Sequence, residues 1–199
     1  MDTMFILAAL TKLRQICNSP ALLSEEEYYG NHSSKIEALM EDIESKHRHH
    51  KILVFSQFVG MLDLIRTELD KKEIQYAYLT GQSKKREDLV EDFQNNEETR
   101  VFLISLKAGG VGLNLTEADY VYLVDPWWNP AVENQAIDRC YRIGQTKKVV
   151  AIRMICPDTI EEKIMDLQES KRELVNDLIK TDGGALKSLT HTDLMDLFA

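Results

Sequence analysis

The sequence predicts an α/β fold in three layers, with one parallel β-sheet covered by helices on both faces. Short apolar runs rich in Val, Ile, Leu and Tyr recur between residues 51 and 155, and amphipathic stretches of helical period separate them. Such alternation favours βαβ units, which make the strands parallel. A chain of 199 residues with 44% hydrophobic residues suffices for one such domain plus a helical appendage, and is too short for two domains.

The predicted elements begin with an amphipathic helix at 4–17, which breaks at Asn18-Ser19-Pro20, and an exposed acidic linker at 25–33. A capping box of Ser34 and Glu37 opens the next helix, at 34–45. Strands and helices then alternate, with strands at 51–55, 74–79, 100–105, 119–124 and 149–155 and helices at 58–70, 84–95 and 130–141.

A long helix at 159–180 closes the predicted fold, between a capping box of Thr159 and Glu162 and the pair Gly183-Gly184. These elements divide the chain into three parts. They are a leading helix with its linker (1–33), the α/β domain (34–158), and the long helix with a short amphipathic tail (159–199).

The predicted helix at 130–141 has two unlike faces. Asn129 is its expected N-cap, and Pro130 stands at the first helical position. One polar stripe contains Gln135, Asp138, Arg139 and Arg142, and the opposite apolar face contains Val132, Ala136, Cys140 and Ile143. Exposed charges are usually only a solvated surface. Here, however, the helix directly follows two adjacent Trp residues, which a solvated face does not normally carry.

Polar residues and glycines follow the carboxyl ends of the predicted strands, where parallel sheets bind ligands. The residues at these ends include Ser56, Thr80, Lys107 and Trp128. The glycines at 109, 110 and 112 allow backbone N–H groups to converge on an anion, although ordinary loop geometry explains a glycine-rich turn equally well. Consecutive residues of an extended segment point to opposite sides, so only one of Trp127 and Trp128 is expected in the core. Its position favours Trp128 as the outward one.

Composition narrows the classes of function. The net charge of −9 argues against a nonspecific nucleic-acid binder, but residues 100–150 hold six basic and five acidic residues, which permits a local basic surface. Cys17, Cys140 and Cys156 lack metal-ligand spacing and indicate reduced thiols of an intracellular protein, so we predict no metal site. The sequence has no apolar run of the roughly 20 residues that a membrane span needs, and no signal peptide.

Several segments together resemble the second RecA-like lobe of the SWI/SNF-like ATP-dependent DNA translocases of helicase superfamily two. Residues 135–145, Gln-Ala-Ile-Asp-Arg-Cys-Tyr-Arg-Ile-Gly-Gln, resemble the last helicase motif of the family, and residues 125–130 resemble the segment before it. Residues 107–112 resemble its Lys-Ala-Gly-Gly-x-Gly motif, and residues 13–20 its Leu-Arg-Gln-x-Cys-Asn-His-Pro helix. Cys140 stands where many members have Ala, and Ser19 where His is common.

The resemblance implies roles in ATP hydrolysis. Arg139 and Arg142 would serve as arginine fingers that stabilise charge on the transferring γ-phosphoryl group. The expected nucleotide-facing residues are Gly110, Gly112, Gln135 and Asp138. The sequence lacks both a Gly-x-x-x-x-Gly-Lys-Ser/Thr loop and an Asp-Glu-x-His pair. ATP and Mg²⁺ are therefore expected mainly on an N-terminal RecA-like lobe outside this chain, and the chain alone is expected to hydrolyse no ATP.

The resemblance also implies double-stranded DNA as a partner, beside the N-terminal lobe. The expected DNA-binding residues are Ser56, Gln57, Thr80, Gly81, Ser105, Lys107, Trp128 and Asn129. The helix at 159–180 corresponds to the family's brace helix, although simple packing on the sheet explains it equally well. Nucleoprotein or polymerase complexes are candidate substrates and no membrane partner is expected. The expected location is nuclear in a eukaryote and cytoplasmic in a bacterium.

Two alternatives remain open. The first is an RNA helicase lobe of the same superfamily, which usually has Arg in place of Gln145 and lacks the Trp-Asn-Pro segment. The second is a non-catalytic RecA-like interaction module, against which the presence of both Arg139 and Arg142 argues.

Overall fold

The computed structural model describes residues 3–23, 28–110, 112–127, 129–138, 145–178 and 192. Its helices are α1 (Thr3–Asn18), α2 (Ser34–Lys46), α3 (Val59–Lys71), α4 (Arg86–Asn95), α5 (Pro130–Asp138) and α6 (Ile160–Leu178), with 3₁₀ turns η1 (Pro20–Leu22) and η2 (Ala108–Gly110). Its strands are β1 (Ile52–Ser56), β2 (Tyr76–Leu79), β3 (Val101–Ser105), β4 (Tyr120–Leu123) and β5 (Val150–Arg153). No described helix is both long and apolar enough to cross a membrane.

The five strands form one parallel sheet in the order β2-β3-β1-β4-β5. Central strand β1 pairs with β3 through Ile52 and Val101, and with β4 through Ile52 and Tyr120. Every residue of β1 and β3 is buried, because helices cover both faces and leave no solvated side for polar residues. The predicted α/β fold with a parallel sheet is confirmed.

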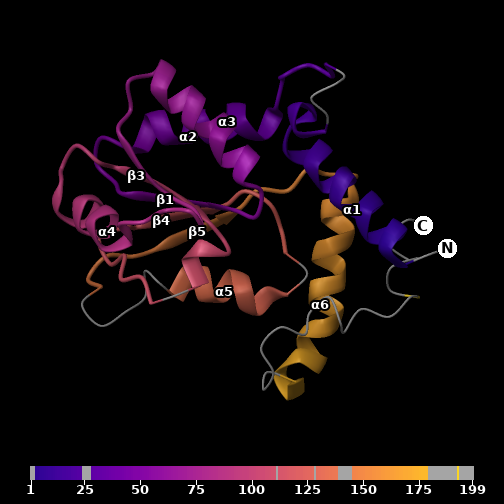
Figure 1. Ribbon diagram of the computed structural model, residues 1–199. Helices are drawn as coiled ribbons and strands as arrows, with labels where there is room; N and C mark the ends of the chain where they lie inside the picture. Colours follow the sequence, from indigo (N-terminus) through magenta and orange to yellow (C-terminus); the bar gives the residue numbers. More distant parts are fainter. Residues whose placement is uncertain are drawn as a thin grey trace.

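Two apolar cores lie on the two faces of the sheet. Helices α2 and α3 enclose one core against β1 and β3, with Leu39 and Leu62 fully buried in it. Helices α4 and α5 enclose the other, which contains Phe93 and Ala136. Figure 1 shows α2 and α3 above the sheet, α5 below it and α4 at its left.

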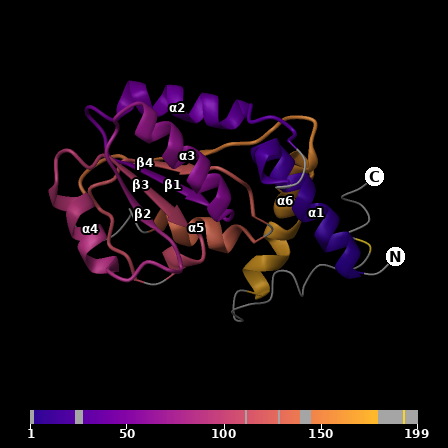
Figure 2. The same cartoon turned by 45° about the horizontal axis from the view of Figure 1, so that its top comes forward.

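Helices α1 and α6 form a separate pair at one end of the sheet, side by side in both views (Figures 1 and 2). A third apolar cluster joins them, in which Ile6 and Leu10 of α1 pack with Ile160 and Ile164 of α6, and Trp127 packs against it. The N-terminal and C-terminal parts of the chain therefore meet beside the carboxyl ends of β1 and β4.

The start of α2 differs by one residue from the prediction. Its N-cap is Ser33, not Ser34, because the Ser33 hydroxyl accepts a hydrogen bond from Ile36 N at 3.2 Å. The same hydroxyl donates to the carbonyl of Asn18 at the end of α1. That tertiary contact selects between two adjacent serines, and it is invisible to local sequence pattern.

Candidate functional site

The predicted functional residues occupy the loops after β1, β2, β3 and β4. Because all strands are parallel, these loops share one edge of the sheet, and the loop after β1 lies between those after β3 and β4. Leu106 N donates to Ser56 O at 3.0 Å, which ties the β3 loop to the β1 loop. Trp128, Arg139 and Arg142 were predicted for this region and lie outside the described residues.

The hydroxyl residues at this edge are buried and bonded within the loops. Ser56 is fully buried, and its hydroxyl donates to Asp125 and accepts from Phe58 N. The Ser105 hydroxyl accepts from Ala108 N at 3.3 Å and the Thr80 hydroxyl from Gln82 N at 3.4 Å. These side chains therefore shape the loops, an arrangement that the sequence pattern alone does not reveal.

Other predicted residues are available at the surface. Lys107 and Gly81 are exposed, and Gln57 in the β1 loop is partly exposed. Asn129 caps α5 as predicted, since its side-chain oxygen accepts from Ala131 N at 3.0 Å. Among the described residues of the β3 loop, Lys107 therefore offers an exposed ammonium group that a phosphate could reach.

Two glycines of the turn after β3 are favoured for different reasons, one for space and one for backbone conformation. A Cβ at Gly109 would lie 3.1 Å from Cε1 of buried Phe55, so any larger residue there would require the Phe55 ring to shift. Gly112 has φ +54° and is exposed, a left-handed conformation that glycine adopts without strain. Gly110, which like Gly112 is predicted to face the nucleotide, ends η2.

The two described residues of the predicted polar stripe on α5 face solvent. Gln135 and Asp138 are exposed, while Ala136 is buried in the core below the sheet. Glu133, which the sequence did not single out, is fully buried. One of its oxygens accepts from Trp127 N at 3.1 Å and the other from Arg153 Nε at 2.8 Å. The start of α5 is therefore anchored both to the loop before it and to β5.

Asp125, two residues after the end of β4, is the centre of the hydrogen bonding at this edge. It is 1% exposed, and its carboxylate accepts from Asn18 Nδ2 at 2.9 Å, from Gln57 N at 3.0 Å and from the Ser56 hydroxyl. Three donors compensate the burial of this charge. They come from α1 and from the β1 loop, so Asp125 joins the N-terminal helix to the sheet.

Arg14 of α1 reaches the same loop. Its guanidinium donates to Gln57 Oε1 at 2.5 Å and to Pro126 O at 3.1 Å, and lies 5.2 Å from the ring centroids of both Phe58 and Trp127. Burial lowers the pKa of Arg14, and Asp125 and Glu161 partly oppose that shift. Trp127 thus faces inward, as expected for one of the two tryptophans.

A buried ion pair connects α2 to α6. Lys35 Nζ lies 2.7 Å from Glu161 Oε2, with side-chain exposures of 4% and 0%. Lys35 also donates to Asn18 Oδ1 at 3.0 Å and to Val124 O at 2.6 Å. Since Asn18 bonds Asp125 as well, one continuous polar network links α1, α2, α6 and the end of β4.

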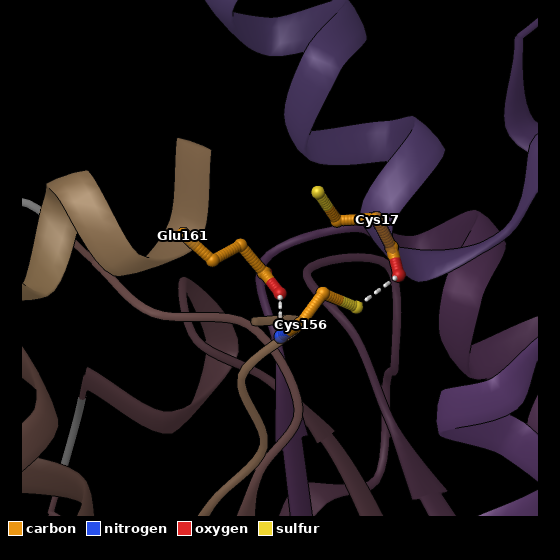
Figure 3. Close-up of side chains that lie close together, drawn as sticks. All are labelled: Cys17, Cys156 and Glu161. Carbon is orange, nitrogen blue, oxygen red and sulfur yellow. Dashed lines mark hydrogen bonds between the residues drawn. The ribbon is translucent and has the colours of Figure 1, made fainter. Parts of the chain in front are cut away.

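Two thiols lie beside this network (Figure 3). Ligand atoms of Cys17, Cys156 and Glu161 lie within 4.8 Å of one another, and the Cys156 thiol donates to Cys17 O at 3.3 Å. Burial raises the pKa of Cys17 above its usual value and that of Cys156 to about 11. Metal ligation requires thiolates. Glu161 also pairs with Lys35, and the Cys156 hydrogen bond to Cys17 O connects the end of α1 to the loop before α6.

The raised pKa of Cys156 predicts slow alkylation. Moving a thiol pKa from 9.0 to about 11 lowers the thiolate fraction at pH 8, and the higher nucleophilicity of the more basic thiolate offsets only part of the loss. We expect iodoacetamide to modify native Cys156 at least ~10-fold more slowly than the urea-unfolded residue, with a rate that still rises between pH 8 and 10. Mass spectrometry of quenched digests measures both rates, and equal rates would contradict the burial of this thiol.

Known proteins resemble this chain in sequence and in fold. The model of the helicase conserved C-terminal domain matches residues 34–144. The ATP-dependent helicase rhp16 of Schizosaccharomyces pombe is 45% identical over 172 residues, which are 84% of this chain and 20% of that protein. The chain spans about a fifth of the length of the curated relatives it matches.

Two solved structures from Sulfolobus solfataricus extend the match over 98% of this chain. The C-terminal domain of its SWI2/SNF2 ATPase has a TM-score of 0.73 and 37% identity, with 81% of that chain covered. The SWI2/SNF2 ATPase core in complex with double-stranded DNA has a TM-score of 0.76 and 38% identity, with 42% of that chain covered. The chain therefore belongs to the SWI2/SNF2 family of helicases, as its conserved C-terminal, RecA-like domain.

Proposed function

We propose that this chain is the second motor lobe of an ATP-dependent translocase that moves along double-stranded DNA. The observation that carries the proposal is the carboxyl edge of the sheet, where Lys107 and Gly81 are exposed on loops whose buried hydroxyls accept hydrogen bonds from the loop backbone. Its similarity over 98% of the chain to an ATPase core solved with double-stranded DNA supports the same partner.

The proposed DNA contacts divide by chemistry. Lys107 supplies a mobile positive charge to a phosphate, while backbone N–H groups of the β1, β2 and β3 loops donate hydrogen bonds to the same strand. The hydroxyls of Ser56, Thr80 and Ser105 set the shape of those loops, since each is buried and already bonded. Gln57, Asn129 and Trp128 complete the proposed surface. Contacts of this kind recognise the DNA backbone and carry little sequence preference.

The nucleotide side is proposed for the neighbouring surface of η2 and α5. The exposed left-handed turn at Gly112 leaves the backbone accessible, and Gln135 and Asp138 point into solvent. These features fit a surface that closes onto a nucleotide held elsewhere. ATP with Mg²⁺ would supply the phosphoryl-transfer chemistry from the other lobe. Arg139 and Arg142 are proposed to stabilise the negative charge that develops there.

Trp128 is proposed to lean on sugar or base edges of the DNA. We expect Trp128→Ala in the full-length protein to leave folding nearly intact and to lower DNA-stimulated ATPase. Translocation should fall further than hydrolysis, because a strand that is held less firmly slips during closure of the lobes. Triplex displacement measured beside ATPase at matched salt gives the number of ATP molecules used per displaced strand.

Trp127→Ala is the matched control for this change. Trp127 packs against the α1–α6 cluster and under Arg14, so its loss should lower the melting temperature. If Trp128→Ala instead unfolds the protein, or translocates per ATP as well as the parent does, Trp128 belongs to the core.

The same triplex assay tests the proposed function itself. The full-length parent should displace a third strand from duplex DNA only when ATP is present, with little dependence on the duplex sequence. ATP hydrolysis without any displacement would contradict a translocase.

A further inference from the structure

We propose that Arg14 of α1 and Gln168 of α6 are positioning residues for ATP hydrolysis. Together they hold residues 125–127 in place, and these residues in turn hold the start of α5. In the sequence, α5 is followed by the proposed arginine fingers. The inference rests on the proposed function for its catalytic consequence. It goes beyond that function because it assigns a role in hydrolysis to the α1–α6 pair, which carries none of the residues proposed to touch ATP or DNA.

Each of residues 125–127 is held by side chains from distant parts of the chain. Asp125 takes hydrogen bonds from Asn18, Ser56 and the backbone of Gln57. The Pro126 carbonyl accepts from Arg14 at 3.1 Å and from Gln57 Nε2 at 3.2 Å. Trp127 N donates to Glu133 on α5, and Trp127 O accepts from Gln168 on α6. The main chain here has little freedom to move independently of α1 and α6.

Arg14 is suited to this task by shape as well as charge. Its planar guanidinium lies over two aromatic rings, 5.2 Å from each centroid, and still directs Nη2 at the Pro126 carbonyl. A lysine ammonium keeps the charge but cannot stack on the rings and bond in the same plane. Arg14 is 4% exposed, so water cannot replace the lost contacts.

Gln168 reaches the same segment from the opposite helix. It is 5% exposed, and its amide donates to the carbonyl of Trp127, the residue whose ring lies beside Arg14. The two side chains thus act on neighbouring peptide groups from two helices. A shift of either helix would move residues 125–127, and Glu133 would pass that shift to α5. A displacement of about 1 Å at a reacting group can cost on the order of 100-fold in rate.

The test is a double-mutant cycle in the full-length protein, with Arg14→Lys, Gln168→Met and the two combined. Each single change is expected to lower the kcat of duplex-stimulated ATPase by ~10-fold or more, with the KM for ATP within about twofold of the parent. If both residues act through one segment, the combined variant should lose about as much as the worse single variant, not the product of the two.

Arg66→Lys is the matched control, because Arg66 on α3 also lies over an aromatic ring, 4.8 Å from the centroid of Tyr78, and forms its ion pair with Asp63 of the same helix. Its kcat should equal that of the parent. The melting temperature of every variant is measured as well, so that ATPase rates are compared only at temperatures where each variant is folded. Should Arg14→Lys fail to fold, Gln168→Met alone decides, by its loss of kcat at constant KM.

The outcomes separate the two claims. Unchanged kcat in Arg14→Lys and Gln168→Met, losses that multiply, or a raised KM at constant kcat would each overturn the positioning role while leaving the translocase intact. A parent protein that shows no duplex-stimulated ATPase would overturn the proposed function, and the inference with it.

Discussion

Replacing Arg139 or Arg142 with Ala in the full-length protein is expected to lower the kcat of ATP hydrolysis on the order of 10³-fold or more. The proposed arginine fingers act on charge that develops in the transition state, so the KM for ATP should change much less than kcat. Lysine should not restore activity, because it lacks the planar, forked donor. Steady-state ATPase with saturating duplex DNA measures both constants.

Arg48→Ala is the control for this pair, since Arg48 is an exposed residue in the loop between α2 and the amino end of β1, whereas the proposed site lies at the carboxyl ends of the strands. It should leave kcat and melting temperature unchanged. A modest loss of activity in Arg139→Ala or Arg142→Ala, accompanied by a lower melting temperature, would instead mean that these arginines hold the fold.

The largest effect on stability is expected from Lys35→Met. The change leaves Glu161, which is fully buried, without its 2.7 Å partner, and also removes donors to Asn18 and Val124 O. An uncompensated buried charge costs about 3–5 kcal/mol. We expect the free energy of unfolding of the 199-residue chain, from urea titration, to fall by that amount.

Lys71→Met provides a matched control. Lys71 and Glu68 are also 2.7 Å apart, but their side chains are 63% and 34% exposed. Its cost should be below about 1 kcal/mol, since water screens the pair. The double variant Lys35→Met with Glu161→Gln removes the stranded charge and should recover part of the loss. Equal costs for Lys35→Met and Lys71→Met would contradict the buried network.

The fold was predictable because its signals are local and repeated. Apolar runs such as 101–105 can only be central strands when amphipathic helices lie on both sides of them in sequence. The cap of α2 was misplaced by one residue because Ser33 is chosen by its bond to Asn18, which is a tertiary contact. Local pattern cannot distinguish two adjacent serines that both precede a helix.

The loops of the candidate site were located correctly in outline, because the carboxyl ends of parallel strands share an edge. What the sequence could not show is which polar residues face outward. Ser56 precedes a loop like any exposed hydroxyl, yet it is fully buried against Asp125, 69 residues away. The Leu-Arg-Gln-x-Cys-Asn run contains Arg14 and Asn18, so the sequence placed both residues on the predicted first helix. Their bonds to Pro126 and Asp125, more than 100 residues along the chain, were not visible in it.

The ATPase rate of the full-length protein with duplex DNA, single-stranded DNA and RNA at matched salt shows most directly which nucleic acid this lobe serves. Salt must be fixed because backbone contacts weaken steeply as it rises. A motor lobe that holds duplex DNA by its backbone predicts the greatest stimulation with duplex DNA. Equal or greater stimulation by RNA would mean an RNA helicase lobe, and no stimulation by any of the three would mean a non-catalytic module.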